Sequence, residues 1–369
     1  MPYRPKDIYR GRRKFRVPLT ILLFALVFLV AGSVAMFFFL QQYMVYDADG
    51  ATLQLPFGRE EGPEAEGLGP TPEPTFEPVQ VQVIWENPDF EDLDMGTWDG
   101  LKSVQGLFIP FGTVTDAEAL AASVSAVDSG GYNMAVLEMK NAGGQLVWPS
   151  SAETALAYRT DGTTDVTAAI ASLHQAGKTV AAQMSCFSDS LLLQHNWSFA
   201  LRYADDSICQ TPEGNYWLDP YNQTVRTYLT DLARELAAMG FDEIILADLY
   251  HPVAESGFAY SEQLTTEADP VVAVCQMGRR IVEALQDTEA VVSARLDGAS
   301  LRAGQGAQTG QDVSVFWRMF ARLYCPSAYD ILASDKELAV DKMNGGDADA
   351  RFIPVVGVIP EDNKSYVVG

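Results

Sequence analysis

The sequence predicts an α/β protein whose folded part is a (β/α)8 barrel of the TIM type, with an irregular or incomplete last unit. Residues 95–369 number about 275, which is enough for one large domain with a substantial core. Four segments share one order, in which an amphipathic helix leads into a nearly continuously apolar strand. This alternation predicts right-handed βαβ units and a parallel sheet. The candidate strands number eight, as a closed barrel requires.

The predicted strands, in chain order, are residues 106–110, 134–137, 179–182, 243–246, 290–293, 321–324 or 329–332, 352–356 and 365–368. Helices with apolar residues at helical spacing precede four of them, over residues 120–127, 166–173, 225–236 and from Pro270 onward. Glycines end the first three helices. No helix fits between residues 357 and 364, so the last unit is expected to be irregular. An open doubly wound sheet is the alternative, but no Gly-x-Gly-x-x-Gly or Walker-type loop follows any strand.

The N-terminal segment predicts a membrane anchor. Residues 1–16 carry seven basic groups and one acidic group, and residues 17–40 carry no charge. A helix of that length crosses a bilayer core of about 30 Å, with its basic flank in the cytoplasm. A cleaved signal peptide is the alternative, but the apolar run continues past the small residues at 33–35. We therefore expect a cytoplasmic tail (1–16), a transmembrane helix (17–40) in contact with lipid, and an extracytoplasmic remainder.

Residues 41–94 are predicted to be a disordered acidic linker rich in Pro, Glu and Gly. Between Tyr46 and Lys102 there are fourteen acidic residues and one basic residue. The chain has a formal net charge of −24, and removing the basic first sixteen residues leaves −30. Such a field repels phosphate backbones, so nucleic acid is not an expected partner.

The residue types that bind metals or act as nucleophiles are scattered. The four cysteines lie far apart without a Cys-x-x-Cys pair, and there are three histidines. No zinc site, other metal or cofactor is therefore predicted. A Gly-x-Ser-x-Gly elbow is also missing from the sequence, which argues against an esterase.

Carboxylates follow three of the predicted strands, at the end of the barrel where chemistry takes place. Glu138, Asp248 and Asp297 are the candidate catalytic residues. Two carboxylates that face each other across a cleft can hydrolyse a glycosidic bond, one as the acid and the other as nucleophile or base. The alternative is structural, with Lys140 and Arg295 pairing these charges.

Further polar and aromatic residues near the strand ends are candidates for binding the substrate: Lys140, Asp189, Trp217, Asp219, Tyr250, His251 and Arg295. Flat aromatic faces suit sugar rings, but such residues also pack loops against barrels. His251 is equally consistent with a hydrogen-bonded residue at the rim. Asp219 belongs to a string that begins a helix, with Asn222 as its predicted N-cap, so a structural role is the alternative there.

Several strings resemble a bacterial family of glycoside-hydrolase-like barrel domains whose function is formally unknown. They are Val-Leu-Glu-Met-Lys at 136–140, Trp-Leu-Asp-Pro-Tyr-Asn at 217–222, Gly-Phe-Asp-Glu-Ile at 240–244, and the segment from Pro326 to Tyr329. The resemblance covers most of residues 100–360 and implies a TIM barrel with a carbohydrate-active role.

The sequence departs from that family after the fourth strand. The family places its strand-end Asp opposite Ala247 and an aromatic residue opposite Asp248, and the Arg that follows is Tyr250 here. Glu138 also stands where the family usually has Asp. Displacement by one residue turns a strand side chain to the other face, so Asp248 needs a backbone irregularity to reach the site.

Two functional hypotheses follow. The first is a membrane-anchored, extracytoplasmic glycoside hydrolase that cleaves cell-wall or environmental polysaccharide through Glu138 and Asp248, with Asp297 as the substitute. The second is a catalytically inactive barrel that binds glycan or scaffolds a complex of the bacterial cell envelope. The altered residues after the fourth strand favour the second, and the retained Glu138 and Asp219 favour the first.

Overall fold

The computed structural model describes residues 44–47, 50–53, 101–211, 214–254, 257–260, 270–327, 348–360 and 365–369. The chain divides into two compact units, residues 1–82 and 83–369. In the first unit, strands β1 (Met44–Asp47) and β2 (Gly50–Leu53) pair as an antiparallel hairpin, a local element that the predicted linker did not include. The predicted cytoplasmic tail and transmembrane helix lie outside the described residues. Within the described ranges, no helix has the length and apolar character to cross a membrane.

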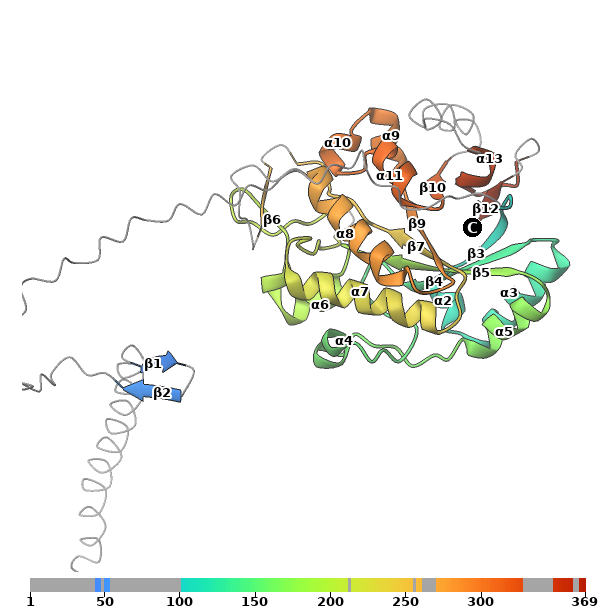
Figure 1. Cartoon of the computed structure of the whole chain (residues 1–369). Helices are drawn as coiled ribbons and strands as arrows, with labels where there is room; N and C mark the ends of the chain where they lie inside the picture. Colours follow the sequence, from blue (N-terminus) through green and yellow to red (C-terminus); the bar gives the residue numbers. More distant parts are fainter. Residues whose placement is uncertain are drawn as a thin grey trace, which may run out of the picture. The chain divides into compact units, whose positions relative to one another are not determined.

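The second unit is a closed barrel of eight parallel strands (Figure 1). Neighbouring strands follow chain order, and β12 pairs with β3 to close the ring, which excludes the open sheet. The strands are β3 (Gln105–Ile109), β4 (Met134–Lys140), β5 (Thr179–Ser185), β7 (Glu243–Ala247), β9 (Val291–Arg295), β10 (Leu323–Pro326), β11 (Phe352–Val356) and β12 (Tyr366–Val368). All eight predicted strands are confirmed. The sixth is β10, which overlaps the first of its two predicted positions.

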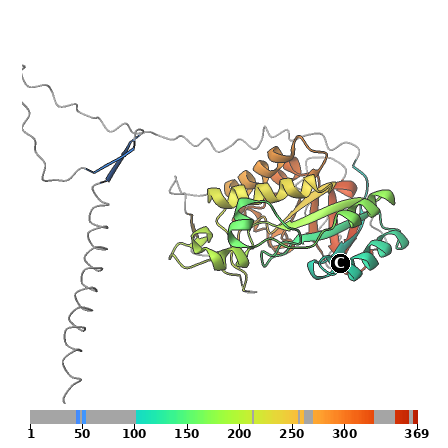
Figure 2. The same ribbon diagram turned by 90° about the horizontal axis from the view of Figure 1, so that it is seen from below.

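Helices surround the barrel. In chain order they are α2 (Phe111–Val114), α3 (Ala117–Ser129), α4 (Glu153–Tyr158), α5 (Thr167–Gln175), α6 (Ser190–His195), α7 (Gln223–Ala238), α8 (Pro270–Leu285), α9 (Gly298–Ala303), α10 (Gly306–Thr309), α11 (Val313–Met319) and α13 (Ala348–Arg351). The two long helices α7 and α8 lie side by side in both ribbon views (Figures 1 and 2). A short 3-10 helix (Trp197–Phe199) and a small antiparallel pair, β6 (Arg202–Tyr203) with β8 (Phe258–Ala259), belong to the loops.

Local signals in the sequence explain where helices begin and end. The Asn222 side chain accepts hydrogen bonds from the backbone N–H groups of Thr224 and Val225, which confirms it as the N-cap of α7. Gly240 follows α7 with a φ of 95°, a left-handed conformation that costs glycine little. The connection between β11 and β12 spans residues 357–365, and its described residues form no helix, in line with the predicted irregular last unit.

Two apolar layers hold the barrel. The larger one lies between the sheet and its helices, where α7 contributes Leu229, Leu232 and Leu236. The smaller one fills the barrel interior with inward side chains such as Val136 and Ile353. Successive residues of a strand alternate between these layers, so a side chain's layer shows which way it points.

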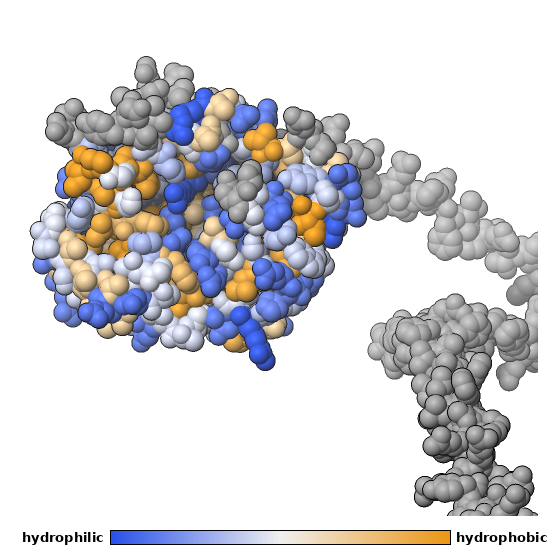
Figure 3. Space-filling view, turned by 180° about the vertical axis from the view of Figure 1, so that it is seen from behind, coloured by the Kyte–Doolittle hydropathy of each residue, from blue (hydrophilic) through white to orange (hydrophobic). Residues whose placement is uncertain are grey.

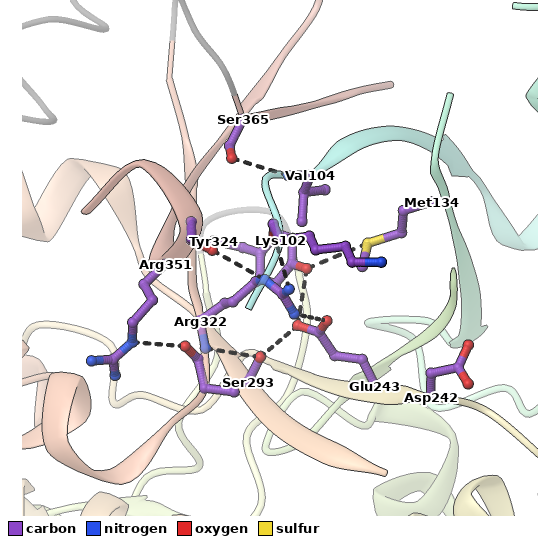
Figure 4. A network of polar contacts seen from close by, with 12 residues as sticks. Lys102, Val104, Met134, Asp242, Glu243, Ser293, Arg322, Tyr324, Arg351 and Ser365 are labelled. Carbon is purple, nitrogen blue, oxygen red and sulfur yellow. Dashed lines mark hydrogen bonds and ion pairs between the residues drawn. The ribbon is translucent and has the colours of Figure 1, made fainter. Parts of the chain in front are cut away.

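The N-terminal end of the barrel is closed by what we call the barrel-floor network: Glu243, Ser293, Arg322 and Tyr324 (Figure 4). The fully buried Glu243 carboxylate lies 2.6 Å from the Arg322 guanidinium and accepts hydrogen bonds from the Ser293 hydroxyl at 2.5 Å and the Tyr324 hydroxyl at 2.9 Å. Arg322 also donates to the carbonyls of Ala350 and Lys102. These bonds join strands that are distant in sequence, and this end of a barrel usually serves stability.

The surface gives little sign of a single apolar face. On the side opposite to Figure 1, hydrophobic residues form separate patches among hydrophilic ones (Figure 3). The large hydrophobic side chains that are exposed within the described ranges lie on four segments: Leu156, Trp197, Val253, and the neighbours Val358 and Ile359.

Candidate functional site

Asp248 follows β7 in a left-handed backbone conformation, with a φ of 51°. Along β7, Ile245 packs inside the barrel while Ile244 and Leu246 pack against the helices. Regular alternation would therefore turn Ala247 inward and Asp248 outward. The left-handed residue changes this direction, and the Asp248 Oδ2 atom accepts a hydrogen bond of 2.6 Å from the Ser185 hydroxyl. Asp is among the few residues that adopt this conformation readily, and such strain is typical of functional sites.

Glu138 lies on β4 at an inward position, two residues beyond Val136 of the inner core. Its Oε2 atom accepts a hydrogen bond of 2.8 Å from the backbone N–H of Phe111, which follows β3. Burial raises the pKa of the Glu138 carboxyl above its ordinary value of 4.5; the Phe111 hydrogen bond and Arg295 oppose this rise, and the negative charge of Asp248 adds to it. Glu138, Asp248 and Arg295 are therefore close enough for their charges to interact at the mouth of the barrel.

A cavity of about 150 Å³ lies inside the barrel and takes one lining residue from each of the eight strands. Most of the lining is apolar. Its polar members are Gln183 of β5, Arg295 of β9 and Tyr324 of β10. Arg295 Nη1 donates to Gln183 Oε1 at 3.4 Å. Arg295, predicted as a substrate-binding residue, thus faces both the cavity and the carboxylates.

Asp297 is placed differently from the other two candidate carboxylates. Its Oδ1 atom accepts a hydrogen bond from the backbone N–H of Ala299, and its backbone carbonyl accepts one from the N–H of Leu301. Asp297 therefore lies at the start of α9. The backbone N–H of Asp297 donates to Gln311. Asp297 is not among the charges that shift the Glu138 pKa. The structure therefore brings together Glu138 and Asp248 and gives Asp297 a local capping role.

Lys140 does not pair with Glu138, contrary to the structural alternative. Its ammonium lies 2.9 Å from Asp189 Oδ2, and both side chains are fully buried. A shift of register between Glu138 and Lys140 accompanies this arrangement. Asp189 also accepts from the backbone N–H of Leu192 and caps α6. The pair joins the last residue of β4 to the loop after β5, and neither residue has surface with which to contact a ligand.

The aromatic and polar residues predicted around the rim are mostly interior. Trp217 is 2% exposed and donates from Nε1 to the backbone carbonyl of Tyr250 at 2.7 Å. His251 is fully buried, with Nδ1 at 3.3 Å from the Tyr260 hydroxyl, and burial lowers its pKa to about 3. At neutral pH this histidine is uncharged and lies away from solvent.

Asp219 is also fully buried, and it accepts from the backbone N–H of Tyr221 at 2.8 Å. The loop residues fold on one another, as isolated bridges such as that between Ser188 and Trp217 show. Of the seven predicted substrate-binding residues, Tyr250 and Arg295 alone keep more than a trace of exposed surface.

Three groups at the site were not predicted: the Ser185 hydroxyl, the Gln183 amide and the Phe111 backbone N–H. Ser185 and Gln183 occupy alternate positions of β5 that point inward, so polar residues at every second strand position were the available signal. The Phe111 contact gives no such signal, because any residue could supply the N–H. The described residues contain no group of three metal-binding side chains.

An eight-stranded parallel barrel with two interacting carboxylates at the carboxyl ends of its strands has the general form of a TIM-barrel enzyme. A family model with the description "Putative glycosyl hydrolase domain" matches residues 106–330, which is more than half of the chain. The protein belongs to this family. The predicted resemblance is thereby confirmed.

Two solved structures are similar to the chain, and the first, with a TM-score above 0.5, shares its fold. The PgaB (BpsB) glycoside hydrolase domain from Bordetella bronchiseptica is 12% identical, with a TM-score of 0.52, over 69% of this chain and 84% of that one. A hypothetical protein from Ruminiclostridium thermocellum is 22% identical, with a TM-score of 0.44, over 51% of this chain and 96% of that one. Among curated proteins there is no match.

Proposed function

We propose that this protein is a glycoside hydrolase in which Glu138 and Asp248 form the catalytic carboxylate pair. The observation that carries the proposal is that both carboxylates interact at the mouth of the barrel although their environments differ. Burial raises the Glu138 pKa, which favours the protonated form that a general acid needs. Asp248 is held by the Ser185 hydroxyl, an arrangement suited to a nucleophile or base.

In this mechanism Glu138 donates a proton to the glycosidic oxygen as the bond to the anomeric carbon breaks. The Phe111 N–H holds Oε2, which leaves Oε1 to carry the proton. As that bond breaks, Asp248 either attacks the anomeric carbon or removes a proton from the water that attacks it. In the first case Glu138, now deprotonated, activates a water that hydrolyses the ester between Asp248 and the sugar. Direct attack by Asp248 requires the two carboxyl groups to be about 5–5.5 Å apart. Activation of a water requires a distance of about 6.5–9.5 Å between them.

The substrate class and location rest on the family and on the N-terminal sequence. Family membership supports a glycan ligand. The basic residues 1–16 and the uncharged residues 17–40 support an anchor that holds the barrel outside the cytoplasm, where cell-wall or environmental polysaccharide is available.

A specific observation favours a second candidate function, an inactive barrel that binds glycan or scaffolds an envelope complex. Ala247 occupies the last position of β7, where related sequences are expected to carry the strand-end Asp. Asp248 replaces it only through a left-handed backbone conformation.

The test is sugar release from a panel of cell-wall and plant polysaccharides by the full chain. Glu138→Gln and Asp248→Asn are expected to lower the rate by at least about a hundredfold each. Asp297→Asn is the matched control, because that carboxylate lies outside the pair and asparagine can still cap α9. If the parent releases no sugar and all four proteins bind glycan equally, the hydrolase proposal fails and the binding barrel is supported.

A further inference from the structure

The cavity inside the barrel contains an arginine without a matching carboxylate. Among the described residues, no carboxylate oxygen lies within 4 Å of the Arg295 guanidinium, and its hydrogen bond to Gln183 is long, at 3.4 Å. Glu138 influences Arg295 through charge alone and directs Oε2 to the Phe111 N–H. Most of the five N–H donors of the Arg295 guanidinium therefore have no protein acceptor in the described part of the chain.

In two buried arginines of the barrel, the N–H groups of the guanidinium have acceptors within the protein. Arg322 contacts the Glu243 carboxylate and two backbone carbonyls. Arg351 donates to three backbone carbonyls and stacks on the Trp317 ring, with its guanidinium carbon 3.6 Å from the ring centroid. Arg295 has no comparable set of acceptors, although it is half-buried.

The surroundings of Arg295 supply donors and apolar surface but few acceptors. The amide oxygen of Gln183 accepts the hydrogen bond from Arg295, which leaves the NH₂ group of Gln183 as a donor. The Tyr324 hydroxyl donates to Glu243 at the barrel floor. The remaining lining consists of apolar side chains such as Phe108, Val136 and Val355, together with Gly369. Arg295 keeps part of its surface exposed and its charge interacts with that of Glu138, but most of its N–H donors still have no acceptor in the described part of the chain. The planar fork of arginine matches a carboxylate in particular.

We propose that this cavity is a subsite for a carboxylate carried on a sugar ring, with Arg295 and Gln183 as its donors. The inference rests on the proposed function and narrows its substrate class to polysaccharides that contain uronic acids. The volume of about 150 Å³ corresponds to roughly five water molecules at about 30 Å³ each, which accommodates a carboxylate and the adjoining part of a ring. Arg295 is a binding residue in this scheme, and proton transfer remains with Glu138 and Asp248.

The test measures binding of monosaccharides to the full chain by titration calorimetry. D-Glucuronate and D-galacturonate are compared with D-glucose and D-galactose, which replace the carboxylate by a neutral group. We expect at least one uronate to bind tenfold or more tightly than its neutral counterpart, because charge-assisted bidentate hydrogen bonds are strong. Arg295→Gln should abolish this preference, and Arg295→Lys should restore part of it.

Arg234→Gln is the matched control, since Arg234 lies on the exposed face of α7. It should leave the preference unchanged, and circular dichroism verifies that every variant is folded. Equal binding of uronates and neutral sugars, or a preference that survives Arg295→Gln, would overturn the inference. Acetate that binds as tightly as the uronates would also overturn it, by indicating a small-anion site. Binding is measured without turnover, so a uronate preference in a protein that releases no sugar would separate the two proposals.

Discussion

Replacement of Arg322 by methionine is expected to destabilise the barrel by about 3–5 kcal/mol. The reason lies in the barrel-floor network, where Arg322 approaches Glu243 to 2.6 Å while their side chains are 7% and 0% exposed. Methionine has a similar length but no charge, so the substitution leaves a buried carboxylate whose remaining partners are two hydroxyl groups. A loss of that size is a large fraction of the 5–15 kcal/mol that is typical of total stability.

Urea-induced unfolding of the full chain, followed by circular dichroism, measures the loss. A double variant with Glu243→Gln and Arg322→Met removes both charges and should be more stable than Arg322→Met alone, because no unpaired carboxylate remains. Arg279→Met is the control: its pair with Glu283 on α8 is largely exposed, and the expected change is within about 0.5 kcal/mol. The reasoning is refuted if Arg322→Met costs less than about 1 kcal/mol, or if the double variant is no more stable than the single one.

Three further predictions concern the site and a helix. Ser185→Ala removes the hydroxyl that holds Asp248, so kcat/KM should fall about 10- to 100-fold. The Ser188 hydroxyl donates to a loop carbonyl, and Ser188→Ala should have little effect. Equal losses in both variants would contradict the role of Ser185. The pKa of Glu138 in the folded state is raised above 4.5. The stabilisation that the folded state gains from the protonated carboxyl is therefore complete below about pH 4.5, and it is lost as the pH rises through the raised pKa. Glu138→Gln should therefore raise the urea midpoint at pH 7 but not at pH 4, and a gain of the same size at both values would count against a raised pKa. Asn222→Ala should lower the free energy of unfolding by about 1 kcal/mol in the same assay, while Asn222→Asp, which keeps a capping oxygen, should lower it much less.

The order of elements in the barrel could be predicted because each depends on neighbours in the chain. The apolar runs at 134–137 and 243–246 are β4 and β7, and both strands are buried as their composition requires. Closure was predicted only by counting strands. The pairing of β12 with β3 joins the two ends of the domain, and the sequence carries no local signal for such a contact.

The candidate site could be predicted only in part. Strand ends pointed to Glu138 and Asp248, whose charges interact at the mouth of the barrel. They also pointed to Lys140, Asp189 and His251, which the structure places in the interior. A charged or aromatic residue after a strand has the same local pattern whether it faces the mouth or packs under a loop. The difference arises from contacts between separate loops, such as the pair of Lys140 with Asp189, which are 49 positions apart in the sequence.

The sequence by itself determined the eight strands, the four helices α3, α5, α7 and α8, the N-cap at Asn222 and the family. These features follow from periodicity, from capping residues and from local strings, all of which act over a few neighbouring positions. The tertiary structure alone decided that Asp248 turns toward Ser185, that Glu138 is buried enough to raise its pKa, and that Arg295 faces an internal cavity. Direction, burial and charge pairing depend on groups brought together from distant parts of the chain, and only the closed barrel fixes those distances.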